Sequence, residues 1–299
     1  MKIRNSLSRN LFLIANYLFL ALVCIVCIIP FINLIAVSFS SPIPINEGKV
    51  GLVPVEFTLR SYEFVMRNKA FLTSIVVTLE RLALGLALNM LLTILVAYPL
   101  SMNKSHFRYK NIYAWFFIIT ILFNGGLIPT YMVVRYTGLI DTIFALVFPT
   151  AVPVFNVIVL LNFFRQLPKE IEESAFIDGA GYLVVLLRLY LPLSKPALAT
   201  IMLFCLVGHW NSWFDGLIYM NRATHYPLQS YLQTVVVDPA MYFQNIKNRE
   251  YIGNDILDFI NARTTKASQL IISIIPMLLM YPFLQKYFTK GLVLGSVKG

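Results

Sequence analysis

Charged residues are scarce in this sequence. Asp, Glu, Lys and Arg make up 13% of its 299 residues, against roughly 25% in an average soluble domain. Hydrophobic residues make up 58%, and the mean hydropathy is +0.73. A soluble fold has to cover its surface with polar groups, so this composition excludes an ordinary soluble protein. A bilayer instead accepts continuous apolar helices of about 20 residues, and the composition therefore indicates a membrane protein.

Cysteine and histidine are also rare, with three residues of each. Cys24, Cys27 and Cys205 lie in apolar stretches, without the spacing of a metal site or of a secreted disulfide framework. We interpret them as small hydrophobic residues. The histidines are scattered, with no His-Glu-x-x-His or comparable set of ligands. We therefore predict that the chain holds no metal and binds no cofactor itself.

Signatures of catalysis and of nucleic-acid binding are missing as well. The sequence has no Gly-x-x-x-x-Gly-Lys-[Ser/Thr] loop for phosphates and no His, Cys or Asp constellation at catalytic spacing. We predict a non-catalytic chain that does not hydrolyse ATP. The net charge is +10, but the basic residues are spread between hydrophobic segments and form no stripe. This distribution excludes nucleic acid as a partner and favours a role of the basic residues as topology signals.

Long apolar segments predict six membrane-spanning helices. Their expected limits are residues 11–39, 71–102, 112–131, 142–164, 196–219 and 267–287. Helices are favoured over a barrel because the segments are continuous apolar runs and not alternating strands. The first run continues to Pro42, too long for a signal-peptide core of about 7–15 residues, so we expect it to be retained. The third segment is interrupted near its end by Gly125, Gly126 and Pro129.

The basic residues predict the orientation of these helices. With the N-terminus inside, the cytoplasmic side collects most of the Lys and Arg residues against few carboxylates, and the outer side is close to balanced. We therefore expect an all-α polytopic protein with both termini in the cytoplasm. Its expected parts are cytoplasmic ends at 1–10 and 291–299, one transmembrane domain at 11–290, external segments at 40–70 and 221–266, and a cytoplasmic loop at 165–195.

The cytoplasmic loop predicts a short helix from about Pro168 to Asp178. Proline suits the first turn of a helix, and three glutamates between positions 170 and 173 place negative charge at the positive end of the helix dipole. Gly179 and Gly181 then end or bend the helix, and an apolar element follows over 182–191. Prolines at 192 and 196 separate this element from the fifth span. Taken alone, the pattern also fits an amphipathic element at the membrane surface.

The order of residues in this loop resembles the EAA loop of ATP-binding cassette importers. That loop reads Glu-Ala-Ala, three residues, Gly, nine residues, an apolar residue, any residue, then Leu-Pro. The matching positions here are Glu173, Ser174, Ala175, Gly179, Leu189, Leu191 and Pro192. Asp178-Gly179-Ala180 also matches the Asp-Gly-Ala of the sugar-importing branch. Ser174 replaces the middle alanine of the pattern, which exchanges one small side chain for another.

Two further segments, 123–131 and 281–288, look like the second permease subunit of carbohydrate importers. The resemblance extends over most of the chain. It includes the smaller maltose permease subunit and the branch for polysaccharide-derived oligosaccharides, some of them acidic. The resemblance implies a multi-pass protein of the bacterial cytoplasmic (inner) membrane, surrounded by lipid, that takes part in oligosaccharide uptake.

The resemblance also implies the partners. In that family the EAA helix docks in a cleft of an ATPase subunit, so that two ATPases, which bind ATP and Mg²⁺, drive two permease subunits between inward-open and outward-open states. Carried over to this chain, the contact comprises Glu173, Ser174, Ala175, Asp178, Gly179, Ala180, Leu191 and Pro192. We expect a second homologous permease as the partner in a heterodimer, and an extracytoplasmic solute-binding protein on segment 221–266.

Polar and aromatic residues in apolar surroundings are candidates for the substrate pathway. Aromatic rings stack on the CH faces of sugars while amides and carboxylates bind the hydroxyls, although an interfacial aromatic belt explains the residues near 210–215 equally well. Glu80 lies within the second span beside Arg81, where a pathway role competes with snorkelling or a contact to the sister subunit. The expected pathway residues are Glu80, Asn124, Tyr131, Trp210, Asn211, Trp213 and Asp215.

The alternative is a stand-alone, ion-coupled secondary transporter. Such a protein predicts internal repeats and buried carboxylates in several spans. The sequence has no recognisable repeat, and only Glu80 lies clearly within a span. The importer subunit is therefore our expectation.

Overall fold

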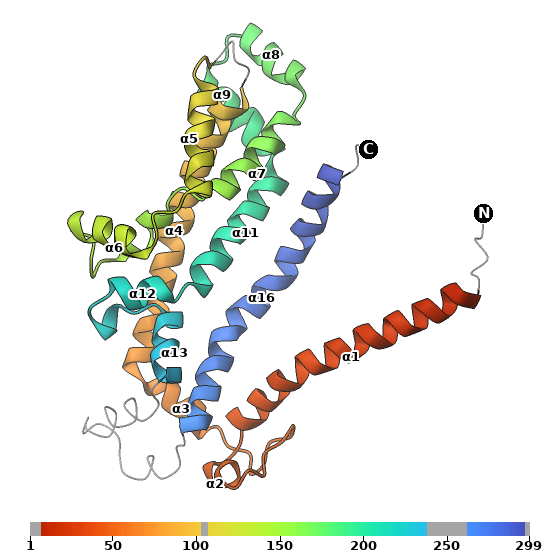
Figure 1. Ribbon diagram of the computed structural model, residues 1–299, viewed down its shortest axis with the longest axis vertical. Coiled ribbons are helices and arrows are strands. Elements are labelled where there is room, and N and C mark those ends of the chain that lie inside the picture. The colour runs from red at the N-terminus through yellow and green to blue at the C-terminus, as the bar shows by residue number, and fades with distance from the viewer. Residues whose placement is uncertain (1–6, 103–106, 238–261, 297–299) are drawn as a thin grey trace. The chain divides into compact units, whose positions relative to one another are not determined.

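A computed structural model describes the backbone of residues 7–102, 107–237 and 262–296 (Figure 1). Within these ranges every regular element is a helix. Internal contacts divide the chain into two compact units, Met1–Lys69 with Thr234–Ile275 and Ala70–Gln233 with Pro276–Gly299. The predicted cytoplasmic ends and the predicted external segment 221–266 lie partly outside the described residues.

Three helices are each long and apolar enough to cross a membrane. They are α1 (Leu7–Ser38), α4 (Lys69–Ser101) and the first part of α16 (Ala262–Ser296). Three further segments reach that length only as two helical pieces with a bend between them. The described residues therefore contain between three and six candidate spans, depending on whether each bent pair crosses the membrane as one unit.

The first bent pair shows that the predicted span 112–131 is broken where Gly125, Gly126 and Pro129 interrupt it. It consists of α5 (Lys110–Leu122) and α6 (Leu127–Tyr136), whose axes differ by 117°. The chain turns at Gly126, where φ is +82° and ψ is −178°. The Asn124 side-chain oxygen accepts a hydrogen bond from the Gly126 N–H at 2.9 Å and so holds the turn. The two glycines and Pro129 indicate the interruption in the sequence, but they do not give the angle of the bend.

The second bent pair occupies the predicted fourth span. It begins with two short 3-10 helices, η1 (Ile143–Leu146) and η2 (Phe148–Thr150), and continues after a 48° bend as α7 (Val154–Arg165). Pro153 stands directly before α7, where its fixed φ and missing N–H are tolerated. Only the second half of the predicted span 142–164 is therefore an α-helix.

The third bent pair confirms that the chain bends between Pro192 and Pro196, as the sequence predicts. The elements are α9 (Tyr182–Val185), the π-helical turn η3 (Leu186–Tyr190), α10 (Leu191–Leu193) and α11 (Lys195–Asn211). Helical structure runs through Pro192, and the 83° bend falls at Ser194. The wide π turn lies just before Pro192, where a regular turn would bring the proline ring against a carbonyl group. The predicted span 196–219 is also interrupted, because a separate helix α12 (Phe214–Tyr219) follows α11.

The first unit folds the segment 40–70 back onto the end of α1. Its short helices are α2 (Pro42–Asn46) and α3 (Arg60–Arg67). The Ser40 hydroxyl accepts a hydrogen bond from the Val55 N–H at 3.0 Å. The Phe39 ring stacks on Phe57 and Tyr62, with centroid distances of 5.4 and 4.9 Å. The predicted external segment is thus an ordered cap at one end of α1.

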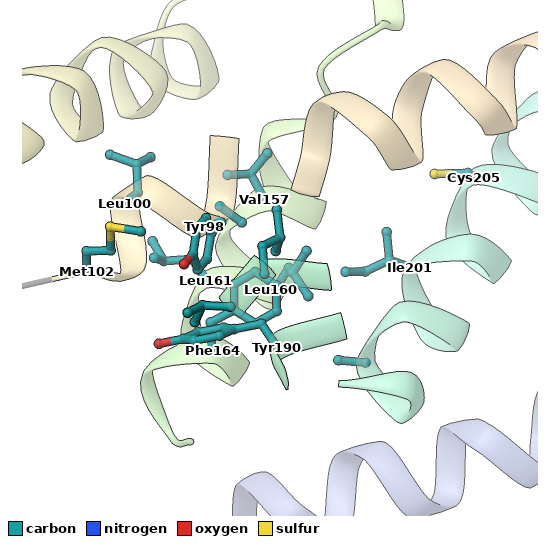
Figure 2. Close-up of a cluster of buried hydrophobic side chains, with 14 residues drawn as sticks. Tyr98, Leu100, Met102, Val157, Leu160, Leu161, Phe164, Tyr190, Ile201 and Cys205 are labelled. Atoms are coloured by element: carbon teal, nitrogen blue, oxygen red, sulfur yellow. The ribbon is translucent and has the colours of Figure 1, made fainter. Parts of the chain in front are cut away.

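The second unit is built around α4. Figure 2 shows its core, where side chains of α4, α7, η3 and α11 pack together, among them Tyr98, Leu160, Phe164, Tyr190 and Ile201. Near the start of α4, Phe71 contacts Tyr231 of α13 (Leu228–Val237), with ring centroids 6.0 Å apart. The long, unbroken α4 therefore contacts most of the shorter, broken elements of the second unit.

Gly126→Ala should lower the free energy of unfolding by about 1–3 kcal/mol, because its φ and ψ fall in a region that almost only glycine adopts. An added Cβ would meet nothing within 4 Å, so the backbone conformation alone causes the loss. Gly125→Ala is the matched control, since its Cβ would lie an ordinary 3.6 Å from that of Pro129. Thermal unfolding in detergent measures both variants, and equal midpoints would contradict this explanation.

Candidate functional site

The loop 165–195 contains the short helix that the sequence predicts. This helix, α8 (Lys169–Ile177), starts after Pro168 and carries Glu170 and Glu172 in its first turn. Figure 1 shows α8 set off from the long helices of the second unit. The expected limits of 168 and 178 are confirmed to within one residue, because the start and stop signals are local.

Gly179 ends α8 by adopting a left-handed backbone conformation with φ of +79°. The Ala180 N–H donates to the Ala175 carbonyl at 2.9 Å, and the Gly179 N–H donates to the Phe176 carbonyl at 3.1 Å. These two bonds form a Schellman motif, which satisfies the last carbonyls of the helix. The bend predicted at Gly179 is confirmed.

The residues of the EAA-like pattern divide between two faces of the loop. Ala175 and Ala180 pack against the core of the second unit together with Phe176 and Leu191. The exposed members are Glu173, Ser174, Asp178, Gly179 and Pro192. Ile177, at the end of α8, is 85% exposed. The exposed surface of α8 and its C-cap therefore presents the carboxylates of Glu170, Glu173 and Asp178 and the aliphatic side chains of Ile171 and Ile177.

A second candidate site lies inside the helical bundle, around a buried arginine of α4. Arg81 is 1% exposed, and its guanidinium group donates to both carboxylate oxygens of Asp215 in α12. A further bond runs from Arg81 Nη1 to the Ser212 carbonyl at 3.3 Å. Bidentate pairing with a carboxylate suits the planar fork of arginine. The ion pair thus ties α4 to the break between α11 and α12.

His209 and Asn89 continue this network toward another break. Arg81 Nε donates to His209 Nδ1 at 3.4 Å, which leaves the proton of the neutral imidazole on Nε2. That nitrogen lies 2.6 Å from Asn89 Oδ1. The Asn89 amide group in turn donates to the carbonyls of Thr150 and Ala151, at 2.6 and 3.0 Å. One chain of hydrogen bonds therefore joins the α11–α12 break to the η2–α7 break through α4.

Gly85 makes room for this arrangement. It lies one turn from both Arg81 and Asn89 on α4, and a Cβ at this position would be 2.4 Å from His209 Nε2. Real side chains do not approach so closely, so the imidazole ring occupies the space that any larger residue would need.

Two further backbone groups, at the α11–α12 break and at the start of α13, bind side-chain hydroxyls. The Ser230 hydroxyl donates to the Trp213 carbonyl at 2.6 Å. One turn before Arg81, the Thr78 hydroxyl accepts a hydrogen bond from the Leu228 N–H at 2.7 Å, at the start of α13. Broken helices are tolerated at membrane depth only where protein groups satisfy the freed backbone. Here Thr78, Arg81 and Asn89 of α4 supply the side chains that bind such backbone groups.

The predicted pathway residues have different environments. Trp210 is 4% exposed, and Asp215 is occupied by Arg81, the Ser212 hydroxyl and the Gly216 N–H. Tyr131 is half-buried and stacks on Tyr219 at 6.3 Å. The exposed members are Glu80, Asn124, Asn211 and Trp213. The structure therefore brings Trp210, Asn211, Trp213 and Asp215 to one helix break, and leaves only Asn211 and Trp213 accessible there.

Arg81, His209 and Asn89 were not predicted as site residues. Their signal in the sequence is weak but present, since Arg81, Gly85 and Asn89 recur every four residues on one face of a helix. The partners of Arg81 lie far along the chain, and no local pattern connects the two segments. No group of three or more His, Cys, Asp or Glu residues that could hold a metal occurs within the described ranges.

Asp141 forms a smaller polar centre between α6 and η1. One carboxylate oxygen accepts hydrogen bonds from the N–H groups of Asn221 and Arg222 and from the ring of His225, at 3.0, 3.3 and 2.9 Å. Burial acts to raise the pKa of Asp141, but these hydrogen bonds outweigh it and hold the pKa below its ordinary value. The carboxylate anchors the chain segment that follows α12.

Comparison with known proteins gives relatives over almost the whole length, although no family model matches the chain. The chain is 39% identical over 295 residues to protein LplC of Bacillus subtilis (strain 168), which covers 99% of this chain and 97% of the relative. It is 37% identical over 294 residues to the polygalacturonan/rhamnogalacturonan transport system permease protein YtcP of the same strain, covering 98% and 100%.

A solved structure is similar as well. It is the crystal structure of a bacterial ABC transporter involved in the import of the acidic polysaccharide alginate. One of its chains matches with a TM-score of 0.87 and 30% sequence identity, over 96% of this chain and 100% of that chain. The agreement extends from fold to sequence along nearly all of both chains.

Asp215→Ala should destabilise the protein by about 3 kcal/mol, because it leaves the Arg81 guanidinium buried without its carboxylate. Glu80→Ala is the matched control, because it removes an exposed carboxylate next to Arg81 in the sequence. It should change the free energy of unfolding by less than about 0.5 kcal/mol. Chemical denaturation in detergent measures both. Similar losses in the two variants would rule out Asp215 as the specific partner of Arg81.

Asp141→Asn should lower the melting temperature at neutral pH, and its difference from the wild type should shrink below about pH 4. The pKa of Asp141 is lower in the folded protein, so the carboxylate stabilises the fold above its unfolded pKa of about 3.9. This contribution is lost as the pH falls through the folded pKa. Melting curves between pH 7 and pH 3 test this, with Asp178→Asn as the exposed control. A constant difference across that range would show that the charge is not responsible.

Proposed function

The chain belongs to the sugar-transporting permease subunits of ATP-binding cassette importers, and from this membership we propose that it forms one half of an oligosaccharide pathway. The other half is a second homologous permease, because one chain of this size does not enclose a sugar pathway by itself. The helix α1 supports this pairing, since its apolar side chains are exposed all round, Phe12 to 69% and Tyr17 to 67%. A helix of that kind has to be covered by lipid or by another subunit.

The outer face of α8 is the proposed docking surface for an ATPase subunit. The observation that carries this proposal is the EAA-like pattern on a short, capped helix whose Glu173 and Asp178 side chains are exposed. Ile177 adds an apolar anchor of the kind that fills a pocket at the centre of an interface. The permease itself is non-catalytic in this scheme, and ATP and Mg²⁺ are bound by two ATPase subunits.

The proposed topology has six spans, counting each bent pair as one. Both termini and α8 then face the cytoplasm, in the bacterial cytoplasmic membrane. The segments 40–70 and 221–266 face the outside, where a solute-binding protein delivers the substrate. The ordered cap that 40–70 forms on α1 provides a firm surface for such a partner.

The proposed substrate is an oligosaccharide, with uronate-containing ones the first to test. The relatives that transport polygalacturonan, rhamnogalacturonan and alginate motivate this choice. Within this chain, we assign the sugar contact to Asn211 and Trp213 at the α11–α12 break, because an exposed amide and an exposed ring suit hydroxyls and CH faces. Arg81 does not serve a substrate carboxylate here, since Asp215 already occupies its guanidinium group.

Purification of the chain from its native membrane in mild detergent tests the assembly. We expect a second permease and an ATPase to co-purify, with ATPase activity in the isolate. Glu173→Lys should reduce the recovered ATPase subunit about tenfold or more, which corresponds to at least about 1.4 kcal/mol of binding free energy. Glu63→Lys is the matched control, because it makes the same charge change at an exposed residue of α3, which lies at the opposite predicted face of the membrane.

The same experiment separates the alternatives. Loss of the ATPase with Glu173→Lys but not with Glu63→Lys would support α8 as the docking surface. Retention of the ATPase in both variants would exclude Glu173 from the contact. A stable lone chain without any ATPase partner would favour a stand-alone secondary transporter.

A further inference from the structure

A buried tyrosine connects α8 to the rest of the second unit. Tyr190 is 7% exposed and stands at the end of the π-helical turn η3. Its hydroxyl group donates a hydrogen bond to Glu172 Oε2 of α8 at 2.8 Å. Glu172 is half-buried, whereas its neighbour Glu173 is exposed. Two adjacent glutamates of α8 therefore point to different sides, one inward to Tyr190 and one outward.

The ring of Tyr190 is held by two other aromatic rings. Its centroid lies 5.0 Å from that of Tyr98 in α4 and 5.2 Å from that of Phe164 in α7, at interplanar angles of 74° and 84°. Figure 2 shows the three side chains together in the core. Edge-to-face pairs of this kind prefer a defined orientation. A movement of the Tyr190 ring therefore acts on both α4 and α7.

Tyr98 adds a second tie between α4 and the same loop. Its hydroxyl group donates to the Tyr182 carbonyl at 3.0 Å, at the start of α9. The segment from Tyr182 to Tyr190 is thus bound to α4 at its beginning by a hydrogen bond and at its end by ring contacts. The π turn lies within this segment, and π turns interrupt regular helices frequently at functional sites.

The contacts of α8 differ in how they transmit a displacement. Ala175 contributes apolar packing, which has no directional preference. Phe176 meets Tyr182 edge to face at 5.1 Å, a contact that stays within the loop. The bond from Tyr190 to the Glu172 carboxylate is directional, and bonds to an ionised acceptor are stronger than neutral ones. A shift of α8 is therefore passed through this bond to the Tyr190 ring, which contacts α4 and α7.

We propose that Tyr190 is a positioning residue that transmits displacement of α8 to α4 and α7 through its hydrogen bond to Glu172. The inference rests on the proposed docking of an ATPase subunit at α8. It adds a defined route from the docking surface into the membrane: the Glu172 carboxylate, the Tyr190 hydroxyl and ring, and then Tyr98. Further along α4 from Tyr98, Arg81 binds Asp215 at the α11–α12 break. A movement of α4 therefore reaches Asn211.

Tyr190→Phe tests this route, because it removes the hydroxyl group and keeps the ring. Asn211→Cys, in a chain whose three native cysteines are replaced by alanine, reports on the break. The probe is a membrane-impermeant maleimide, and its reaction rate is measured in the purified complex without nucleotide and after trapping with ATP and vanadate. We expect the rate to differ about tenfold between the two states in the parent and less than twofold in Tyr190→Phe.

Three further variants make the outcome specific. Tyr113→Phe removes the hydroxyl of an exposed tyrosine in α5 and should behave like the parent. Glu172→Gln keeps an oxygen acceptor and should retain part of the response, whereas Glu172→Ala should match Tyr190→Phe without altering the core. If Tyr190→Phe does not fold, the Glu172 pair therefore still decides the question.

Several results would overturn the inference. One is a full nucleotide response in Tyr190→Phe or in Glu172→Ala. Another is a parallel loss of bound ATPase in these variants, which would indicate a purely structural role. Failure of the proposed function is recognisable separately, because in that case the parent chain itself would recover no ATPase.

Discussion

Inside a bilayer, a backbone amide or carbonyl group has no water to bind, and this constraint governs the second unit. Helix breaks fall within three of the candidate spans, and each break frees groups that need partners. The helix α4 continues from Lys69 to Ser101 with Pro99 only in its last turn, and it supplies side chains to its neighbours. Arg81, Thr78 and Asn89 bind backbone groups next to α12, α13 and α7 respectively. The breaks before α7 and before α12 therefore depend on side chains of α4, whereas the turn between α5 and α6 is held by Asn124 of its own segment.

The same helix connects the two candidate sites. At one end, Tyr98 contacts the loop that carries α8. Further along, Arg81 and Asp215 fix the break at which Asn211 and Trp213 are exposed. A helix is stiff along its axis because every turn is hydrogen-bonded to the next. The two sites are therefore joined by a rigid body, without a chain of flexible contacts between them.

Local signals explain what could be predicted from the sequence. The limits of α8 follow from Pro168, the glutamates of its first turn and Gly179, all within a dozen residues. The existence of long apolar helices follows from composition. The breaks after Asn211 and before α7 have signals in the sequence, Asn211-Ser212 in the first and Pro149 and Pro153 in the second, but the hydropathy averaged over a span-length window does not respond to them. The role of Arg81 also escaped prediction, since its partner Asp215 is 134 positions away.

The prediction for Asp215 and Trp210 illustrates a second limit. Residue type alone suggests a carboxylate and an indole ring for sugar binding. The Asp215 carboxylate, however, forms an ion pair with Arg81, and the Trp210 ring is buried. Chemistry of the side chain indicates what a residue is able to bind. Only the packing around it decides whether a ligand has access.

The contact between Gly85 and His209 constrains how this protein can evolve. The imidazole ring fills the space where a Cβ at position 85 would stand, so a side chain at position 85 requires the ring to move. Such a movement disturbs its hydrogen bonds to Arg81 and Asn89. Substitutions at these two sites, 124 positions apart in the chain, are therefore coupled, and a larger residue at position 85 is tolerated best together with a smaller one at position 209.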